Sequence, residues 1–599
     1  MSSLGEARCT MCSNPPKRRK NAVWGMKVKH PNDKDMEKLK TPTFINTLLG
    51  MTGGLYYRQL KRASKNPRKS QEKTLRGILD LAKETVYGRE HDFAYILKAK
   101  DDTELYKRYQ EKVQVNDYED FRPYVERHKN GEPDILFPGK PALYTTTSGS
   151  TSQPKWIPIF PEYLNNRYGR MTKVWLNNFI QNRPQVFGGK VFSVIGKTVE
   201  GYAPDGTVLG SISGYTQGNC PDFLKVIYAN PPCVSGISDF EARYYVLMRR
   251  GIEQNVSLII AANPSSVVEL QNNVNKYFDD YVTDIENGTI KVDLKIEPEI
   301  RAELEALQKP NPERAAELRE LKAKYGEVLP KHYWPNLQIL NTWRCGNTRI
   351  YLEKFKEWFP EGMLHQEFGY ISSECRFGFP LDDTLNSVLF PHYHYYEFVA
   401  EAEIDNPNPH FLQLHELEEG KRYSIYITTA SGFYRYNMYD LMEVGPSFQN
   451  TPTIHLIQKL HGIVTITGEK LYEQQFVKAV REAERTTDLK TRFFIGFADL
   501  SIKGYKFYYE FEDQNVTQTQ AERFTEEVDR LLQEINMEYK AKRVSLRLKI
   551  PETFRLIPDS LEAFRAQCNA EGARDEQFKL NLLSENEARH QKFKQLVFE

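Results

Sequence analysis

This 599-residue sequence has little cysteine, and what it has is scattered. Seven cysteines so widely spaced in so long a chain do not form a disulfide framework, and they are typical of a reducing compartment. We therefore expect a cytoplasmic protein. The cysteines are Cys9, Cys12, Cys220, Cys233, Cys345, Cys375 and Cys568.

Long apolar runs and an excess of one charge are also missing. No uninterrupted apolar stretch reaches the roughly 18 residues that a membrane-spanning helix needs, and no apolar segment follows the basic residues near the N-terminus as in a secretory signal. Lys and Arg number 81 against 80 Asp and Glu, a formal net charge of +1. That balance argues against electrostatic capture of nucleic acid or of an anionic membrane, and we expect neither as a partner.

What is present is length, which exceeds what one hydrophobic core supports. Residues 1–40 are rich in charge, Pro and Asn without periodic hydrophobicity, and we expect a disordered tail there. Within it, Cys9 and Cys12 could supply two of the four ligands of a structural zinc site. The run Pro16-Lys-Arg-Arg-Lys20 has the composition of a nuclear localisation signal. Plain thiols and a solvated basic run are the simpler interpretations.

Alternating helix and strand signals follow the tail. The spacing predicts a helix from Gln71 that stops at Gly88, strands at Val191–Ile195 and Val256–Ala261, and a helix from Pro264 to near Gly288. Strand followed by helix, repeated, predicts an α/β domain with a largely parallel sheet. A charged helix over Pro312–Lys324 is expected to be a solvated surface helix.

The pattern changes after Val444, where we predict a proline-containing turn and a strand at Thr453–Ile457. Beyond His461-Gly462, strand patterns and a helix at Gln518–Ile535 predict a smaller α+β domain. The strands expected there are Phe493–Phe497, Tyr505–Phe511 and Val544–Ile550. The predicted organisation is a tail at 1–40, a large domain at 41–461 and a small C-terminal domain at 462–599.

The most informative segment is Thr145-Thr-Thr-Ser-Gly-Ser-Thr-Ser-Gln-Pro-Lys155, hydroxyl residues around one glycine, closed by a lysine. Such a loop can surround phosphate oxygens with backbone N–H and hydroxyl donors while the lysine supplies charge. It is not a Walker loop, and it lacks the partner motifs of penicillin-binding proteins. By composition alone a linker is the commoner interpretation.

The loop resembles the phosphate loop of the adenylate-forming superfamily, T-S-G-[ST]-T-G-x-P-K. Two further segments occur in the order that this superfamily requires: Tyr370-Ile-Ser-Ser-Glu374 resembles its second motif, and Tyr434-Arg-Tyr-x-x-x-Asp440 its third. Within the superfamily the sequence is most similar to the auxin-responsive (Gretchen Hagen type) acyl-acid amido synthetases, whose second motif is Y-A-S-S-E. The resemblance runs from about residue 60 through the large domain and more weakly into the small one.

The resemblance implies a fold: an α/β protein with a large N-terminal adenylate-forming domain of mixed sheets flanked by helices, and a smaller, mobile α+β C-terminal domain. It implies ATP and Mg²⁺ as cofactors. The small-molecule partners would be a carboxylic acid and an amine, most plausibly an amino acid.

The resemblance also implies the site. Glu374 would ligate Mg²⁺, Asp440 would bind the ribose hydroxyls, and Lys459 would lie near the ribose. Lys579, in a Q-x-K stretch, would be the catalytic lysine that reaches the α-phosphate, with Lys155 as a second catalytic charge. The β and γ phosphates would contact the loop residues, and the adenine and α-phosphate the second motif. The remaining cofactor-binding residues would be Thr147, Ser148, Gly149, Ser150, Thr151, Ser152, Tyr370, Ser372, Ser373 and Arg435.

Three positions depart from the family pattern. Ser152 and Tyr439 stand where motif glycines are usual, and Ile371 replaces a small residue. If the third-motif glycine serves a positive φ, Tyr439 would be strained there and would displace Asp440.

The activity implied is ATP-dependent: a carboxylic acid is adenylated with release of pyrophosphate, and its acyl group then passes to an amine with release of AMP. The alternatives are an acyl-CoA ligase that uses a thiol acceptor and a nucleotide-binding module without turnover. One metal-like feature, His392-x-His394, lacks a visible third ligand, and a packed pair beside aromatic residues is the simpler interpretation.

Overall fold

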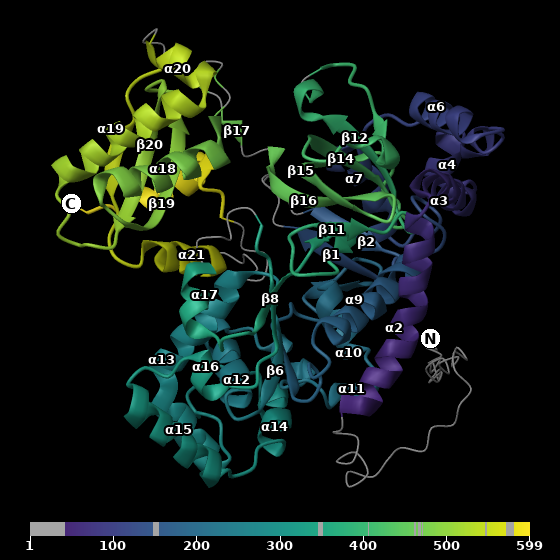
Figure 1. Cartoon of the computed structure of the whole chain (residues 1–599). Coiled ribbons are helices and arrows are strands. Elements are labelled where there is room, and N and C mark those ends of the chain that lie inside the picture. Colours follow the sequence, from purple (N-terminus) through teal and green to yellow (C-terminus); the bar gives the residue numbers. More distant parts are fainter. Residues whose placement is uncertain are drawn as a thin grey trace, which may run out of the picture. The chain divides into compact units, whose positions relative to one another are not determined.

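The computed structural model describes residues 42–147, 155–345, 352–404, 406–460, 463–464, 466, 469, 471–544, 548–570 and 580–598. Figure 1 shows the course of the chain. The expected tail, the loop residues Ser148 to Ser152, the boundary at His461-Gly462 and Lys579 lie outside the described residues.

Helices dominate the first part of the described chain. They are α2 (Pro42–Ser64), α3 (Pro67–Ala82), α4 (Val86–Glu90), α5 (Phe93–Ile96), α6 (Asp102–Lys112) and α7 (Tyr118–Lys129).

The helix predicted from Gln71 is α3, and its bounds differ from the prediction. It begins at Pro67, because the Asn66 side chain caps it by accepting the Lys69 N–H at 3.1 Å. It ends at Ala82 rather than Gly88. The hydroxyl of Thr85 accepts the Gly88 N–H at 3.0 Å and starts α4, so Gly88 belongs to the next helix.

A parallel four-stranded sheet has the order β3–β6–β7–β8. Its strands are β3 (Lys190–Ser193), β6 (Val256–Ile260), β7 (Ile339–Thr342) and β8 (Leu364–Glu367). Successive residues point to opposite faces, so Leu258 packs with residues of α2 and α9 (Gly169–Asn182), and Ile259 with residues of α12 (Phe240–Gly251) and α13 (Pro264–Asn287). The predicted strand–helix alternation is confirmed, and both faces are covered.

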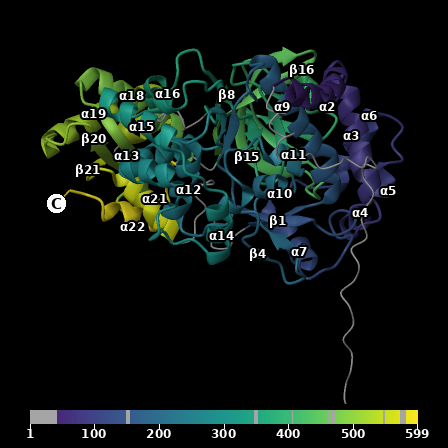
Figure 2. The ribbon, with the colours of Figure 1, turned by 90° about the horizontal axis from the view of Figure 1, so that it is seen from below.

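The second helix prediction is also confirmed. α13 begins at Pro264 and ends at Gly288, which takes the left-handed conformation with φ 66°. α15 (Pro312–Tyr325) packs against α13, and Figure 2 shows α12, α13 and α15 together.

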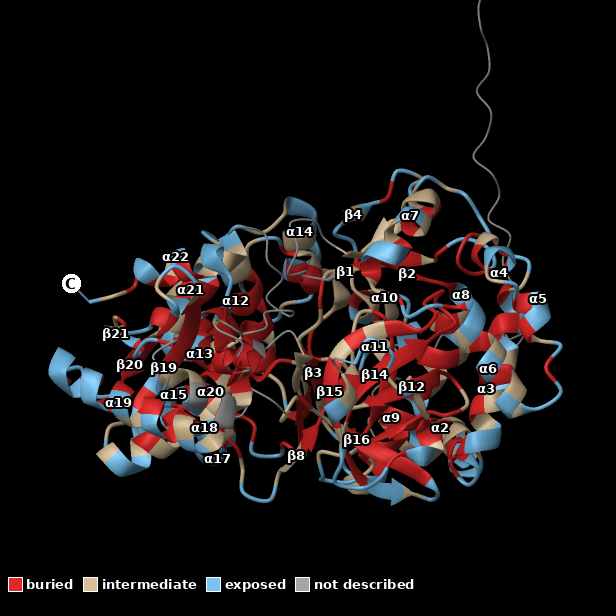
Figure 3. Cartoon of the chain, turned by 90° about the horizontal axis from the view of Figure 1, so that it is seen from above, coloured by how far each residue is buried: buried red, intermediate tan, exposed pale blue. Residues whose placement is uncertain are grey.

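A second sheet has eight strands in the order β13–β12–β14–β15–β16–β11–β10–β9, antiparallel throughout. Figure 3 shows how completely its central strands are buried. The strands are β9 (Tyr370–Ile371), β10 (Arg376–Phe379), β11 (Ser387–Leu389), β12 (Tyr395–Ala400), β13 (Leu412–Gln413), β14 (Arg422–Thr428), β15 (Tyr436–Phe448) and β16 (Thr451–Lys459).

The proline-containing turn predicted after Val444 is wrong. β15 continues past Pro446 to Phe448, and the turn comes at Gln449, whose φ is 57°. The register shifts between Gly445 and Phe448, and a proline is tolerated at such an irregularity because no ladder hydrogen bond is needed from it.

The hydroxyl-rich loop joins two strands of a smaller sheet. β1 (Leu143–Thr147) and β2 (Lys155–Ile159) are antiparallel, with Thr147 opposite Lys155. The sheet has the order β2–β1–β5–β4 and also contains β4 (Gly201–Tyr202) and β5 (Val208–Leu209).

The C-terminal part has its own sheet, in the order β21–β20–β19–β22, and its own hydrophobic core. α18 (Glu473–Thr487) and α19 (Gln518–Ile535) contribute to that core, and the helix predicted at 518–535 is confirmed. The strands are β19 (Thr491–Asp499), β20 (Gly504–Phe511), β21 (Glu552–Arg555) and β22 (Leu583–Ser584).

The strand predicted at Val544–Ile550 is wrong. Val544 ends the helix α20 (Met537–Val544), and the edge strand is β21 instead. Residues 545–547 lie outside the described residues; of the apolar residues described, Leu548 is buried, but Val544 is 71% exposed and Ile550 65% exposed, so they do not form one buried face. Arg543 bonds Asp529 of α19 through both Nε and Nη2 at 2.9 Å, which holds α20 against that helix.

The other described elements are short or peripheral. No described helix is both long and apolar enough to cross a membrane. They include α8 (Pro161–Tyr163), α10 (Ile212–Gly218), α11 (Asp222–Lys225), α14 (Pro298–Ala306), α16 (Pro330–Tyr333), α17 (Leu352–Trp358), α21 (Ser560–Ala570), α22 (Glu587–Lys594), β17 (Ile463–Val464) and β18 (Leu471–Tyr472).

Candidate active site

The second and third motifs meet through their side chains. The Tyr370 hydroxyl donates a 2.7 Å hydrogen bond to Asp440 Oδ2. Tyr370 lies on β9 and Asp440 on β15, which are four places apart in the sheet order, so the sheet must curve for them to touch. The Tyr370 ring stacks on Phe377, with 4.1 Å between ring centroids. Burial raises the pKa of Tyr370 well above its ordinary value, so the hydroxyl keeps its proton and remains a donor.

Asp440 has a second partner, on the neighbouring strand. Lys459 is its register partner on β16, and Lys459 Nζ lies 2.6 Å from Asp440 Oδ1. Asp440 is 1% exposed, whereas 37% of the Lys459 side chain is exposed. The carboxylate is therefore fixed from two sides, and one of its partners can still reach solvent.

Glu374 lies in a bend that Ser372 holds. The Ser372 hydroxyl accepts the Glu374 N–H at 3.2 Å, and the Ser372 N–H donates to the Cys375 carbonyl at 3.0 Å. Ser373 lies in the same bend. The buried Glu374 carboxylate receives a long 3.4 Å contact from the Tyr436 hydroxyl of the third motif. A carboxylate has about four lone-pair sites, so this contact leaves acceptor capacity for a ligand.

Tyr439 adopts the conformation that its place in the motif demands. Its φ is 50°, in the left-handed region that a glycine would occupy without strain. The expected displacement of Asp440 does not occur, because Asp440 keeps its contacts with Tyr370 and Lys459. The Tyr439 N–H donates to Asn437 Oδ1 at 2.8 Å, which stabilises the turn.

Arg435 is held inside the protein. Its Nε bonds Glu397 Oε2 at 3.0 Å and its Nη1 bonds the Val113 carbonyl at 2.9 Å, while the guanidinium lies 4.4 Å from the Phe411 ring centroid. Both charges of the pair with Glu397 are buried. With φ 45°, Arg435 also turns the backbone into the third motif.

The C-terminal end of the hydroxyl-rich loop is held by a tyrosine, and strand pairing places Thr147 opposite Lys155. The Tyr118 hydroxyl accepts the Trp156 N–H at 2.6 Å and donates to the Trp156 carbonyl at 2.9 Å. Lys155 Nζ lies 5.6 Å from the Tyr118 ring centroid. Thr147 and Lys155 therefore present the two ends of the loop side by side.

Sequence reasoning missed the residues that support the third motif. Asn116 is the clearest case: its side chain donates to the Tyr434 carbonyl at 2.9 Å, and its N–H donates to the Arg435 carbonyl at 3.0 Å. Asn437 N–H returns a bond to the Asn116 carbonyl at 2.9 Å. No local pattern signals this role, because Asn116 precedes its partners by more than 300 residues.

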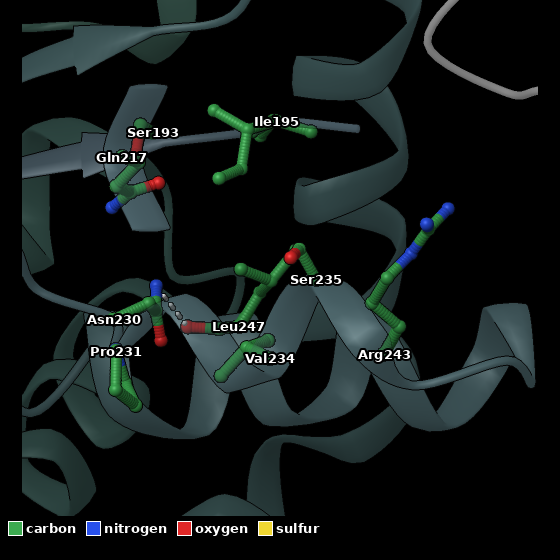
Figure 4. Close-up of a pocket in the computed structure, with 10 residues that line it drawn as sticks. Ser193, Ile195, Gln217, Asn230, Pro231, Val234, Ser235, Arg243 and Leu247 are labelled. Carbon is green, nitrogen blue, oxygen red and sulfur yellow. Dashed lines mark hydrogen bonds between the residues drawn. The ribbon is translucent and has the colours of Figure 1, made fainter. Parts of the chain in front are cut away.

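A small polar cavity lies at the carboxyl end of β3 (Figure 4). Its volume is about 10 Å³, room for one water and too little for an organic acid. Gln217 Oε1 and Asn230 Oδ1 are buried there without a hydrogen-bond partner, while Asn230 Nδ2 donates to the Leu247 carbonyl at 3.4 Å.

The paired histidines belong to the packing. His394 Nε2 lies 3.0 Å from the Arg376 carbonyl, and burial lowers the pKa values of His392 and His394 to about 3. In the part of the chain that the structure describes, no group of three or more His, Cys, Asp or Glu side chains is placed to hold a metal. His392 lies beside Phe390 and Tyr393, and His394 lies beside Phe377 and Tyr396, which is the packing beside aromatic residues that the simpler interpretation predicts.

Three family models match the chain in sequence order. They are the GH3 family N-terminal domain at residues 56–364, the central domain at 387–459 and the C-terminal domain at 474–588.

Curated relatives are similar over most of their length. Jasmonoyl--L-amino acid synthetase JAR4 of Nicotiana attenuata is 25% identical over 445 residues, covering 70% of this chain and 74% of the relative. Indole-3-acetic acid-amido synthetase GH3.10 of Arabidopsis thaliana is 23% identical over 468 residues, covering 72% and 78%.

Solved structures share the fold. The GH3.15 acyl acid amido synthetase superposes with a TM-score of 0.78 at 21% identity, covering 90% of this chain and 95% of the other. A 2-hydroxyisobutyryl-CoA ligase in its postadenylation state gives a TM-score of 0.50 at 13% identity, covering 88% and 91%. At these identities the likeness concerns the fold alone.

Proposed function

This chain belongs to the GH3 family, and from that premise we propose that it is an ATP-dependent acyl-acid amido synthetase. The observation that carries the proposal is the contact between the second and third motifs, Tyr370 with Asp440 and Tyr436 with Glu374. Residues about 70 positions apart are brought to one place by a curved sheet, in the combination of hydroxyl, carboxylate and lysine that a nucleotide needs.

The proposed reaction has two displacements. A carboxylate oxygen of the acid attacks the α-phosphorus of ATP, the bond to the β-phosphate oxygen breaks, and pyrophosphate leaves. The amine nitrogen of an amino acid then attacks the acyl carbon of the adenylate, loses a proton, and displaces AMP. Catalysis of the first step is mainly in-line positioning and neutralisation of charge on the phosphates.

We assign the residues as follows. Lys155 and the loop contact the β and γ phosphates, the segment from Tyr370 to Ser373 contacts the adenine and α-phosphate, and Asp440 accepts from the ribose hydroxyls. Support for the last role is the fixed orientation of Asp440 between Tyr370 and Lys459. Each Asp440 oxygen has lone-pair capacity beyond its present partner, and the half-exposed Lys459 can shift to admit the ribose.

Glu374 fits a magnesium ion. A hard cation is commonly held by one or two carboxylates together with substrate phosphates, and Glu374 presents a buried carboxylate with free acceptor capacity. When bound, Mg²⁺ would neutralise charge on the phosphates. The residues themselves orient the nucleotide: Ser372 holds the bend, and Tyr436 fixes one Glu374 oxygen.

We assign Arg435 a positioning role. Its guanidinium is already engaged by Glu397 and by the Val113 carbonyl, which supports an action through the backbone of the third motif.

We also propose that residues 41–461 form the catalytic body, that residues 462–599 form a mobile lid, and that Lys579 of the lid reaches the α-phosphate in the first step. Support for the division is the separate hydrophobic core of the C-terminal part. The disordered tail at 1–40 and the cytoplasmic location stay predictions.

One assay tests the function. The purified chain is given ATP, Mg²⁺, labelled pyrophosphate and a panel of aryl and alkyl acids, and acid-dependent ATP–pyrophosphate exchange is measured. AMP release is then followed with amino acids or with coenzyme A. Exchange with at least one acid, and AMP release that depends on an amino acid, are expected.

The alternatives give different results. AMP release with coenzyme A alone would show a thiol-using ligase and contradict the amide assignment. Nucleotide binding without exchange for any acid would indicate a module without turnover.

A further inference from the structure

Glu367 occupies the junction between the two large sheets. It is the last residue of β8 in the parallel sheet, and only Phe368 and Gly369 separate it from Tyr370, the first residue of β9 in the eight-stranded sheet. Its side chain is 2% exposed. A carboxyl group so deeply buried needs donors to satisfy it.

The donors come from two loops. Glu367 Oε2 accepts the Arg344 N–H at 2.5 Å, and Oε1 accepts the Gly369 N–H at 3.0 Å. The Cys345 side chain also bonds this carboxyl group. Arg344 and Cys345 follow β7, whereas Gly369 follows β8, so one carboxyl group ties the ends of two neighbouring strands together.

Gly369, the residue before Tyr370, is held at both of its backbone polar groups. Glu367 takes the Gly369 N–H, and the Trp343 indole N–H donates to the Gly369 carbonyl at 3.1 Å. Gly369 has φ +97°, and a Cβ there would lie 2.5 Å from the Gly378 carbonyl oxygen. The backbone path into Tyr370 is therefore determined by close packing and by two hydrogen bonds, and Tyr370 in turn bonds Asp440.

From this geometry we propose that Glu367 is a positioning residue for the adenine nucleotide, fixing Tyr370 through the backbone of the preceding residue, Gly369. The inference rests on the proposed function for its meaning in catalysis. Its contacts are to backbone groups and to a thiol, so Glu367 acts on the nucleotide only through Tyr370.

Ionisation of Glu367 separates this role from a merely structural one. Burial raises its pKa to about 7. The ionisable groups beside it are the Arg344 guanidinium, which is charged, and the Cys345 thiol, which bonds it; His365 on the same strand turns to the Thr342 hydroxyl at 2.8 Å. When the Glu367 carboxyl group is ionised, both of its oxygens can accept backbone N–H groups. When it is protonated, one oxygen carries a hydrogen that points toward a donor. The hydrogen bonds from Glu367 to the Arg344 and Gly369 N–H groups are therefore strongest above about pH 7.

The stability effect has the opposite sign. A carboxyl group whose pKa is raised in the folded state contributes stability at low pH that is lost as the pH rises through about 7. If Glu367 were only structural, function would follow stability and improve at lower pH. A positioning role predicts weaker nucleotide binding at lower pH, despite greater stability.

The test uses AMP as the probe and the full chain. Glu367→Gln keeps the size and shape of the side chain, but it replaces one accepting oxygen with an NH₂ group that faces a backbone N–H donor. The matched control is Glu510→Gln, because Glu510 is equally buried on β20 and also accepts two backbone N–H groups, from Asp559 and Ser560, each at 3.0 Å. AMP affinity is measured by calorimetry between pH 6 and 8.5, and KM for ATP and kcat are measured by pyrophosphate exchange.

We expect Glu367→Gln to weaken AMP binding about tenfold at pH 8, with a similar rise in KM for ATP, and the control to change it less than twofold. Wild-type affinity should fall severalfold from pH 8 to 6, and the variant should show little pH dependence. Trp343→Phe, which removes only the indole donor, should weaken AMP binding about threefold. Equal AMP affinity of wild type and Glu367→Gln at pH 8 would overturn the inference.

Failure of the proposed function is recognised separately. If the wild type binds AMP but shows no exchange with any acid, the AMP series still decides the role of Glu367. If it binds no AMP, hydrogen exchange at the Arg344 and Gly369 amides decides: faster exchange in Glu367→Gln supports the tie, and unchanged exchange contradicts it.

Discussion

The two large sheets hold their polar residues in different ways. In the parallel sheet several buried polar side chains lie at or next to the carboxyl ends of strands, as with Ser193, Asn341 and Glu367. In the eight-stranded sheet two strand carboxylates are held by ion pairs: Glu397 pairs with Arg435, which precedes β15, and Asp440 pairs with Lys459 at the end of β16.

This difference indicates which interactions keep each part of the site rigid. The eight-stranded sheet depends on pairs of side chains, so removing one partner leaves the other uncompensated. The parallel sheet depends on backbone groups at strand ends, so changes of backbone geometry should matter more there. Four substitutions test this contrast.

Breaking the buried ion pair should have the largest effect. Glu397→Ala leaves Arg435 without its carboxylate and should lower the free energy of unfolding by about 3–5 kcal/mol. Urea denaturation followed by circular dichroism measures it. Glu397→Met combined with Arg435→Met should recover much of the loss. Glu286→Ala, which breaks an exposed pair with Arg319, should cost less than about 1 kcal/mol. Similar losses of unfolding free energy for Glu397→Ala and Glu286→Ala would contradict the expected difference between the buried and the exposed ion pair.

The junction glycine comes second. Gly369→Ala brings a Cβ to 2.5 Å from a backbone oxygen in a left-handed conformation, and should cost about 2–4 kcal/mol from strain and overpacking together. Gly362→Ala is the control, because Gly362 has φ +79° with open space around it and should cost only about 1–2 kcal/mol. Thermal unfolding compares them. An equal loss in both would mean that close packing at the junction adds nothing.

Removing one hydroxyl comes third. Tyr370→Phe deletes the hydrogen bond to the Asp440 carboxylate, a bond worth about 1.5–3 kcal/mol, and should raise KM for ATP about tenfold or more. Tyr395→Phe deletes a comparable buried hydroxyl, which donates to Gln413 at 2.9 Å, and should leave KM unchanged. A Tyr370→Phe enzyme with the wild-type KM for ATP would show that the hydrogen bond between Tyr370 and Asp440 does not contribute to nucleotide binding.

The smallest effect is expected at the unusual motif residue. Tyr439→Gly relieves left-handed strain but adds freedom to the unfolded chain, so the net change should be within about 1 kcal/mol. KM for ATP should change less than threefold, because Asp440 is already in place. Tyr439→Ala retains the strain without the ring and serves as comparison. A tenfold gain in ATP affinity for the glycine variant would show that the tyrosine impairs the site.

The sequence predicted part of this arrangement. The parallel sheet followed from the local alternation of strand and helix patterns, whereas the three motifs, and the conditional expectation of a positive φ at residue 439, came from the family resemblance. The ion pair between Glu397 and Arg435 could not, because pairing across strands depends on register that no local pattern encodes. The same holds for Asn116, and for the curvature that brings Tyr370 to Asp440.

The wrong predictions have local causes. Alternation at Val544–Ile550 imitates a strand, yet Val544 and Ile550 at its two ends are exposed. Gly88 was expected to stop a helix, but it lies inside the next helix, which Thr85 caps. Glu367 left no signal, since a single acid before a motif reads as a surface residue until burial is known.

The two-residue link between β8 and β9 constrains the length of the chain itself. Only Phe368 and Gly369 separate Glu367 from Tyr370, and the three Cα–Cα steps between those two residues span at most about 11 Å. One inserted residue would turn the Tyr370 side chain to the opposite face of its strand, away from Asp440. Replacements elsewhere along this stretch can be repacked, but a change in its number of residues cannot, so the interval between the two sheets should tolerate substitution far better than insertion or deletion.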